Sequence, residues 1–319
     1  MQSRSARLPI AALLLVLVSS TLAMGQIHKK DSDSLGSTAT DRLKQSNIVP
    51  LSSLRNEEIY NRGVAMYRKG EYAKAARIYQ ESCNGGNGSA CTNLGYLHER
   101  GLGVDKDETV SAALYRQGCD AKDAQGCSNL ALLYFRGRGV EKDPHRAAEL
   151  NQRGCDGGSA SGCANLGTIY WNGSGVPKNE ELGARLMQRG CDGGIAQACR
   201  SLGFFYETGR GVTKDDSRAL KLYEHACDRG EASACTNAGL IQSKGTPLGQ
   251  NESSAFDFFR RACQGGDALG CGTLGSIYER GRGVRVDQNR AAEFYKLGCN
   301  RGDNESCIGI SRLRDYRQN

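Results

Sequence analysis

Residues 155–163 read Cys-Asp-Gly-Gly-Ser-Ala-Ser-Gly-Cys, a glycine-rich stretch between two cysteines that lie eight residues apart. Eight residues of a continuous α-helix rise about 12 Å, whereas the Cα atoms of a disulfide lie roughly 4–7 Å apart. The two cysteines can therefore bond only if the chain reverses between them, and glycine and serine at these positions indicate a turn. The stretch predicts a disulfide that joins the end of one helix to the start of the next.

The same pair of cysteines recurs every 36 residues, and each of the 14 cysteines belongs to such a pair. A fixed period of roughly 20 to 50 residues indicates stacked supersecondary units instead of a single globule. We therefore predict seven disulfides, which are Cys83–Cys91, Cys119–Cys127, Cys155–Cys163, Cys191–Cys199, Cys227–Cys235, Cys263–Cys271 and Cys299–Cys307.

Each 36-residue unit has the apolar spacing of two helices. A leucine, a small residue and a tyrosine, as in Leu166, Gly167 and Tyr170, stand at offsets that share one helix face. Glycines then permit a positive φ where this first helix ends, in the turns that begin at Gly101, Gly137, Gly173, Gly209 and Gly281.

A second helix follows in each unit. Its predicted N-caps are Asp107, Asp143, Asn179, Asp215, Asn251 and Asp287. Its buried stripe runs from alanines to a large aromatic residue, which is Tyr115, Tyr223, Phe259 or Tyr295. Each unit is therefore predicted to be a helical hairpin.

Composition narrows the function classes. Glycine accounts for 42 of the 319 residues, hydrophobic residues for 39% and aromatic residues for 7%, which is little for the core of a barrel or doubly wound sheet. A net charge of +7 without a basic block gives little support for nucleic-acid binding. We therefore expect no nucleic acid among its partners.

The N-terminus has the pattern of an export signal. Arg4 and Arg7 precede an apolar run over residues 10–18, and small residues stand at 23 and 25. This predicts a signal peptide over residues 1–25 and a periplasmic or secreted protein, in preference to an amphipathic mitochondrial presequence. The run is shorter than the roughly 20 residues that span a bilayer, so no membrane span is expected.

The rest of the chain divides into three predicted segments. Residues 26–55 are polar and predict a flexible leader. Residues 56–82 resemble a plain tetratricopeptide hairpin and predict an N-terminal cap, and residues 83–319 predict the repeat array with a C-terminal cap. At residues 243–248 the usual glycine turn is replaced, which predicts a local change of curvature.

Metal binding is the alternative explanation for the cysteines. Zinc sites favour cysteines two to four residues apart with histidine partners. The four histidines, at 28, 98, 145 and 225, do not keep register with the cysteines. We therefore expect no metal and no cofactor, and we favour disulfides, which suit an exported protein.

Residues 165–179 read Asn-Leu-Gly-x-x-Tyr-x-x-Gly-x-Gly-Val-x-x-Asn, which resembles the Sel1-like repeat, a relative of the tetratricopeptide repeat. The paired cysteines resemble the Helicobacter cysteine-rich branch of that family, and also a mitochondrial cytochrome oxidase assembly factor. The resemblance covers residues 84–311. It implies an all-α fold, an α/α superhelical solenoid that curves around a concave face.

The resemblance also implies a binding groove. In tetratricopeptide relatives a recurring asparagine lines the concave groove and hydrogen-bonds the backbone of an extended ligand, because an amide both donates and accepts. The matching positions are Asn93, Asn129, Asn165 and Asn237, to which Arg100 and Arg136 add attraction for an acidic ligand. The implied partner is a protein or an extended peptide, bound by a monomer. The alternative is that these residues only face solvent or tie the repeats together.

An enzymatic function is the competing class. Some Helicobacter cysteine-rich proteins are described as penicillin-binding or as weak β-lactamases, so the resemblance implies β-lactam binding or hydrolysis as an alternative. The sequence lacks the Ser-x-x-Lys, Ser-Asp-Asn and Lys-Thr-Gly motifs that a serine β-lactamase uses. We therefore assign no catalytic residue and favour an exported, non-enzymatic scaffold.

Overall fold

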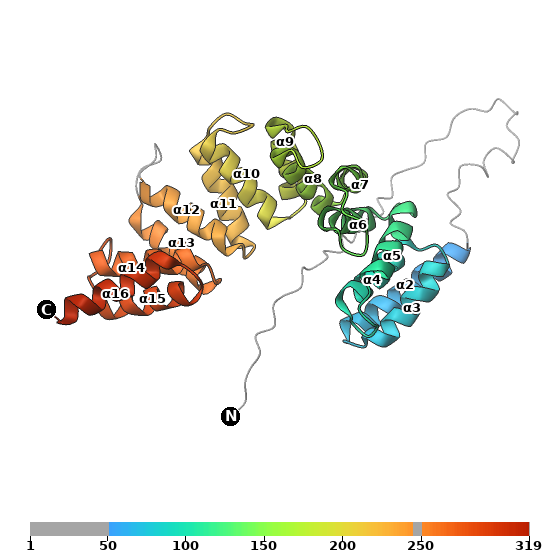
Figure 1. Cartoon of the computed structure of the whole chain (residues 1–319), viewed down its shortest axis with the longest axis horizontal. Coiled ribbons are helices and arrows are strands. Elements are labelled where there is room, and N and C mark those ends of the chain that lie inside the picture. Colours follow the sequence, from blue (N-terminus) through green and yellow to red (C-terminus); the bar gives the residue numbers. More distant parts are fainter. Residues whose placement is uncertain (1–50, 245–250, 319) are drawn as a thin grey trace, which may run out of the picture. The chain divides into compact units, whose positions relative to one another are not determined.

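The computed structural model describes residues 51–244 and 251–318, which form fifteen α-helices without a strand in these ranges (Figure 1). The predicted signal peptide, residues 26–50 of the predicted leader and residues 245–250 of the irregular turn lie outside the described residues. The helices are α2 (Leu51–Arg68), α3 (Tyr72–Asn84), α4 (Gly88–Arg100), α5 (Glu108–Asp120), α6 (Ala124–Arg136), α7 (Pro144–Asp156), α8 (Ala160–Asn172), α9 (Glu180–Asp192), α10 (Ala196–Thr208), α11 (Asp216–Asp228), α12 (Ala232–Lys244), α13 (Glu252–Gln264), α14 (Ala268–Arg280), α15 (Gln288–Asn300) and α16 (Asn304–Gln318).

The helices pack as hairpins in chain order, which confirms the predicted all-α solenoid. Each helix contacts the helices before and after it in the chain. Figure 1 shows the helices following one another in this order. We number the hairpins from α4–α5 to α14–α15 as repeats 1 to 6, and we call their members first and second helices. First helices also contact each other across repeats, for example α4 with α6 and α6 with α8. Consecutive first helices can therefore contribute side chains to one surface.

Local sequence explains where the helices begin and end. All six predicted N-caps of the second helices accept a hydrogen bond from a backbone N–H, as Asp143 does from Arg146 at 2.9 Å. Gly137 ends α6 with a φ of 70°, which glycine adopts without strain. A Cβ at Gly139 would lie 2.1 Å from the backbone oxygen of Glu108, so this turn packs directly on the preceding repeat.

All seven predicted disulfides are present, and all fourteen cysteines are bonded. Their Cα atoms lie 4.5 to 4.8 Å apart. Cys155 stands near the end of α7 and Cys163 near the start of α8, so the bond joins two successive repeats across the turn. Each disulfide therefore fixes a junction between neighbouring hairpins.

The ends of the array form hairpins or half-hairpins of their own. Helices α2 and α3 pack together at the N-terminal end, where the cap is predicted. Helix α2 begins at Leu51, inside the range 26–55 that we assigned to the leader. At the other end α16 packs on α15 and α14, so the last disulfide holds a single helix in place of a full repeat.

Candidate binding groove

The six residues expected to line a groove occupy two positions of the first helices. The four asparagines are the sixth residues of α4, α6, α8 and α12, and the two arginines are the last residues of α4 and α6. Helices of equal length and register present these positions on the same face. The side chains differ, however, in what they contact.

Three of the four asparagines already hydrogen-bond within the chain. Asn93 donates to the Tyr60 hydroxyl at 3.2 Å, and Asn129 accepts from the Gln125 amide at 2.8 Å. The Asn237 side chain hydrogen-bonds Tyr223. Within the described residues Asn165 makes no such bond, so its amide remains available to a ligand.

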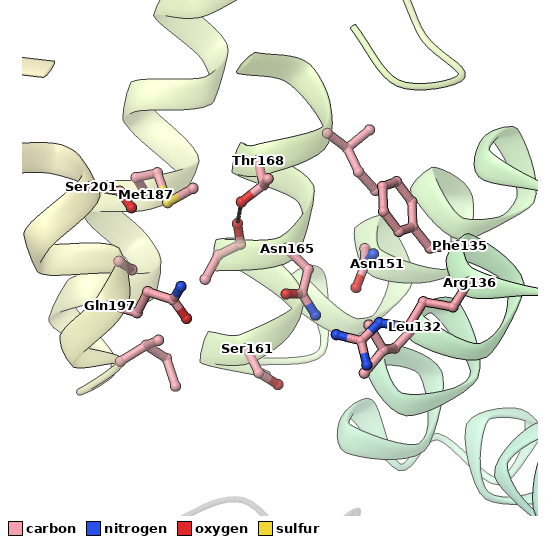
Figure 2. Close-up of a pocket in the computed structure, with 14 residues that line it drawn as sticks. Leu132, Phe135, Arg136, Asn151, Ser161, Asn165, Thr168, Met187, Gln197 and Ser201 are labelled. Atoms are coloured by element: carbon pink, nitrogen blue, oxygen red, sulfur yellow. Dashed lines mark hydrogen bonds between the residues drawn. The ribbon is translucent and has the colours of Figure 1, made fainter. Parts of the chain in front are cut away.

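Asn165 and Arg136 line an open hollow of about 450 Å³ that crosses α8, shown in Figure 2. Leu132 and Arg136 border the hollow on the side of α6, and Gln197 and Ser201 border it on the side of α10. Three successive first helices therefore contribute to one recessed surface, which we call the α8 hollow. Of the six predicted groove residues, the structure brings Asn165 and Arg136 together here.

The second helices provide the floor of the α8 hollow through Asn151 and Met187. Asn151 and Met187 occupy the same position of their helices, and in repeats 1, 4 and 6 this position holds a tyrosine. Each of these tyrosines donates a hydrogen bond to a glutamate of the first helix: Tyr115 to Glu99 at 2.7 Å, Tyr223 to Glu207 at 2.8 Å and Tyr295 to Glu279 at 2.6 Å.

A glycine of the first helix makes room for each of these rings. A Cβ at Gly203 would lie 2.7 Å from the ring of Tyr223, and one at Gly275 would lie 2.6 Å from the ring of Tyr295. Burial, together with the neighbouring Glu279 carboxylate, raises the pKa of Tyr295 to about 12. The hydroxyl therefore stays protonated and donates to the carboxylate.

Repeat 2 replaces all three members of this glycine–glutamate–tyrosine set, with Ala131, Phe135 and Asn151. Asn151 is 2% exposed, and its Oδ1 has no hydrogen-bond partner among the described residues. A buried oxygen without a donor costs about 1–3 kcal/mol.

A second polar contact is lost at the junction between α8 and α10. At three other junctions a hydroxyl of one first helix bonds the N-cap of the next: Thr92 bonds Asp123, Ser128 bonds Ser159 at 2.9 Å and Thr236 bonds Asp267 at 2.7 Å. At this junction Ala164 and Ile195 occupy the corresponding positions, and α10 begins at Ile195 without a side-chain cap. Both residues line the α8 hollow, so the substitutions make its wall apolar.

The hollow carries a single formal charge. Arg136 is exposed, and no carboxylate of the described residues lies within ion-pairing distance of it. No aspartate or glutamate is among the residues that line the hollow. Arg100, at the same position of α4, instead lies over the Tyr96 ring, 5.6 Å from its centroid. The electrostatics of the hollow therefore favour a neutral or anionic ligand.

The lining offers hydrogen bonds but no catalytic set. It contains the hydroxyls of Ser161, Thr168 and Ser201, and it holds no histidine, lysine or carboxylate that would activate one of them. Within residues 51–244 and 251–318 no group of three or more His, Cys, Asp or Glu side chains is placed to hold a metal. None of the described helices is long and apolar enough to cross a membrane.

Repeats 1 to 6 coincide with matches to the Sel1 repeat over residues 88–123, 124–159, 160–195, 196–231, 232–267 and 270–303. The chain belongs to the Sel1 repeat family. This confirms the resemblance inferred from the glycine, leucine and cysteine pattern, and the repeat array is that of a protein-interaction scaffold.

Two solved structures have a similar fold. A Sel1 repeat protein of Oxalobacter formigenes has a TM-score of 0.68 and 22% identity, and the match covers 75% of this chain and 96% of that one. The antigen c5321 of uropathogenic Escherichia coli has a TM-score of 0.69 and 25% identity, over 81% of this chain and 56% of that one.

A curated relative matches a short part of the chain. The "Putative beta-lactamase HcpD" of Helicobacter pylori is 36% identical over 59 residues, which is 18% of this chain. The match spans 19% of the length of that relative. The similarity therefore spans the length of about one and a half repeats.

Sequence reasoning missed the residues that make the hollow distinct. Asn151 and Phe135 stand where repeats 1, 4 and 6 carry tyrosine and glutamate, and Ile195 stands where α4, α6, α8 and α14 have a capping side chain. The available signal was the departure itself, because these substitutions fall in adjacent repeats. Because the repeats are recognised by the residues that recur, each departure looks like an isolated exception in the sequence.

Proposed function

We propose that the protein is an exported scaffold that binds an extended peptide segment of a partner protein across α6, α8 and α10. The observation that carries this proposal is the available amide of Asn165 in a recessed surface that three first helices share. The amide has a donor and an acceptor, which match the C=O and N–H of an extended main chain.

Export is part of the same proposal. A disulfide at every junction is stable in an oxidising compartment, and the apolar run near the N-terminus has the pattern of a signal peptide. The periplasm or the medium would supply the partner.

The experiment uses random decapeptides displayed on phage and panned against the oxidised protein. We expect enriched peptides whose affinity falls about tenfold in Asn165→Ala, since a lost hydrogen-bonding amide costs about 1.4 kcal/mol. Asn237→Ala is the matched control, because it removes the same amide at the same helix position outside the hollow. Equal affinity for the wild type and Asn165→Ala would refute the groove.

The name of the Helicobacter pylori relative raises β-lactam hydrolysis as a competing activity. The residues of the hollow do not favour it, because its hydroxyls lack a neighbouring base. We expect the purified protein to leave nitrocefin intact at the rate of buffer alone. Turnover that disappears on substitution of Ser161 or Ser201 would contradict this expectation.

A further inference from the structure

The α8 hollow lies where the repeats depart from their own pattern. Phe135 and Asn151 replace the hydrogen-bonded glutamate and tyrosine, and Ala164 and Ile195 replace the hydroxyl and the cap. Each change removes a contact that stabilises other repeats, yet all four residues line the same hollow. Stabilising contacts that are absent together around one cavity are typical of a site that serves binding.

We propose that the α8 hollow is a specificity pocket for a tyrosine or tryptophan side chain of the bound peptide, with an acidic residue next to it. This inference rests on the proposed function, because it names the side chains that the groove selects. The partner is a protein whose exposed segment carries such an aromatic–acidic pair.

The volume and the lining residues of the α8 hollow favour an aromatic side chain. A hollow of about 450 Å³ accommodates an aromatic side chain, and Leu132, Phe135 and Ile169 offer it apolar contacts. In repeats 1, 4 and 6 the protein itself fills the equivalent position on the second helix with a tyrosine ring. In repeat 2 that ring is missing, so a ring from the partner can take a similar place.

The hydrogen-bonding part follows from Asn151. Its buried Oδ1 is an acceptor without a donor in the described part of the chain. In the view of Figure 2 Asn151 lies between Phe135 and Asn165, and Arg136 lines the same hollow. A phenol O–H or an indole N–H supplies the missing donor, whereas phenylalanine would fill the space and leave the oxygen unpaired.

The acidic part follows from Arg136. Its guanidinium borders the hollow without a carboxylate partner among the described residues, and the lining holds no competing acid. A guanidinium recognises a carboxylate through two parallel N–H···O bonds. An aspartate or glutamate beside the aromatic residue would meet it at the rim.

The test begins with the random decapeptides displayed on phage. We expect the enriched peptides to share a tyrosine or tryptophan with an aspartate or glutamate within two residues. Synthetic versions of the best peptide then measure the preference. Replacing the aromatic residue by phenylalanine should weaken binding about tenfold, and replacing the acid by its amide about threefold. Enriched peptides without the aromatic residue would overturn the proposal.

Two variants of the protein separate the contributions. Asn151→Met removes the unpaired oxygen and introduces the residue that the next repeat carries at this position, Met187. We expect this variant to bind the tyrosine and phenylalanine peptides equally. Arg136→Gln should abolish the preference for the acid, whereas Arg100→Gln, the same position in α4, should keep it. Unchanged preferences in Asn151→Met and Arg136→Gln would refute the assignment.

A third variant restores the pattern of the other repeats. Ala131→Gly, Phe135→Glu and Asn151→Tyr together rebuild the glycine–glutamate–tyrosine set and fill the floor of the hollow. We expect this variant to raise the midpoint of thermal unfolding and to lose peptide binding at least tenfold. Full binding by the stably folded variant would refute the pocket.

The outcomes distinguish this inference from the proposed function. If Asn165→Ala weakens binding but the restored variant and Asn151→Met do not, the proposed peptide-binding groove is supported and the proposed aromatic pocket is refuted. If neither Asn165→Ala nor these variants affect binding, both proposals fall.

Discussion

In repeats 1, 4 and 6 a glycine of the first helix gives room to the tyrosine ring of the second. Ala131 stands at the glycine position in repeat 2, where the ring is replaced by the smaller Asn151. The pair of residues thus changes together inside one chain. Close packing explains this, because a Cβ at Gly203 would lie 2.7 Å from the Tyr223 ring.

We predict that Gly203→Ala destabilises the protein. The added methyl group overpacks the contact with Tyr223, which costs about 1–3 kcal/mol and outweighs the better helix propensity of alanine, about 1 kcal/mol. The midpoint of urea unfolding measures the effect. Gly203→Ala combined with Tyr223→Asn copies Ala131 and Asn151 and serves as a control for the clash. A higher midpoint for Gly203→Ala alone would contradict the packing argument.

The buried tyrosines also predict a pH dependence of stability. Burial and Glu279 raise the pKa of Tyr295 to about 12, whereas the pKa of a tyrosine in the unfolded chain is about 10. The fold thus favours the protonated phenol, so its contribution to stability is complete below pH 10 and declines as the pH rises towards 12.

Urea midpoints between pH 9 and pH 11.5 test this dependence. We expect the wild type to lose stability over this range and Tyr295→Phe to lose it less steeply, because phenylalanine does not titrate. Asn289→Gln, an exposed substitution on the same helix, should follow the wild type. Identical slopes for the wild type and Tyr295→Phe would show that Tyr295 does not contribute.

The residues that recur could be predicted from the sequence, including Asn165 and Arg136 of the hollow, whereas Asn151, Phe135 and Ile195 could not. The disulfides and the N-caps could be predicted because the cysteines and the capping residues recur at a fixed spacing. Asn93 and Asn165 occupy the same position of the repeat, so the sequence alone gives no reason to expect different roles for them. The structure distinguishes them because Tyr60, which lies outside the 36-residue repeats, bonds Asn93.

At the scale of a single helix, the caps determine where each second helix starts. Asp143 accepts from the backbone N–H of Arg146 at 2.9 Å, and Pro144 follows at the first helical position. A proline there has a backbone φ already suited to the helix. The start of α7 is therefore specified by adjacent residues, independently of tertiary contacts.

We predict that Asp143→Ala lowers the free energy of unfolding by about 1 kcal/mol, the usual cost of a lost N-cap. Urea denaturation measures it. Glu71→Ala provides the comparison, because Glu71 precedes α3 without a side-chain cap and its loss should cost less than about 0.5 kcal/mol. Equal losses in the two variants would mean that the cap contributes nothing specific.

Across the whole molecule, stability depends on junctions between neighbours. Each repeat contacts the next, so a weakened junction separates two blocks of the array. The disulfide at each junction closes a loop between residues eight apart, which in the chain-entropy model contributes about 2.5 kcal/mol. The covalent bonds reinforce the places where such an array would otherwise open.

We predict that replacing Cys155 and Cys163 by serine lowers stability by about 2–3 kcal/mol and lets the array open between α7 and α8. Hydrogen exchange should show faster exchange at that junction first, and the urea transition should broaden. The same substitution of Cys299 and Cys307 serves as a terminal control, which should affect only α16. Uniform loss of protection along the chain would contradict the nearest-neighbour picture.

The eight-residue spacing of the bonded cysteines has a consequence for how such proteins evolve. Every 36-residue unit brings its own even number of thiols, and each thiol finds its partner nearby instead of at a distant point of the chain. Duplication or deletion of one unit therefore leaves no unmatched thiol. Gene segments of this length can be gained or lost without disturbing oxidation of the remaining protein, so array length is free to vary between descendants.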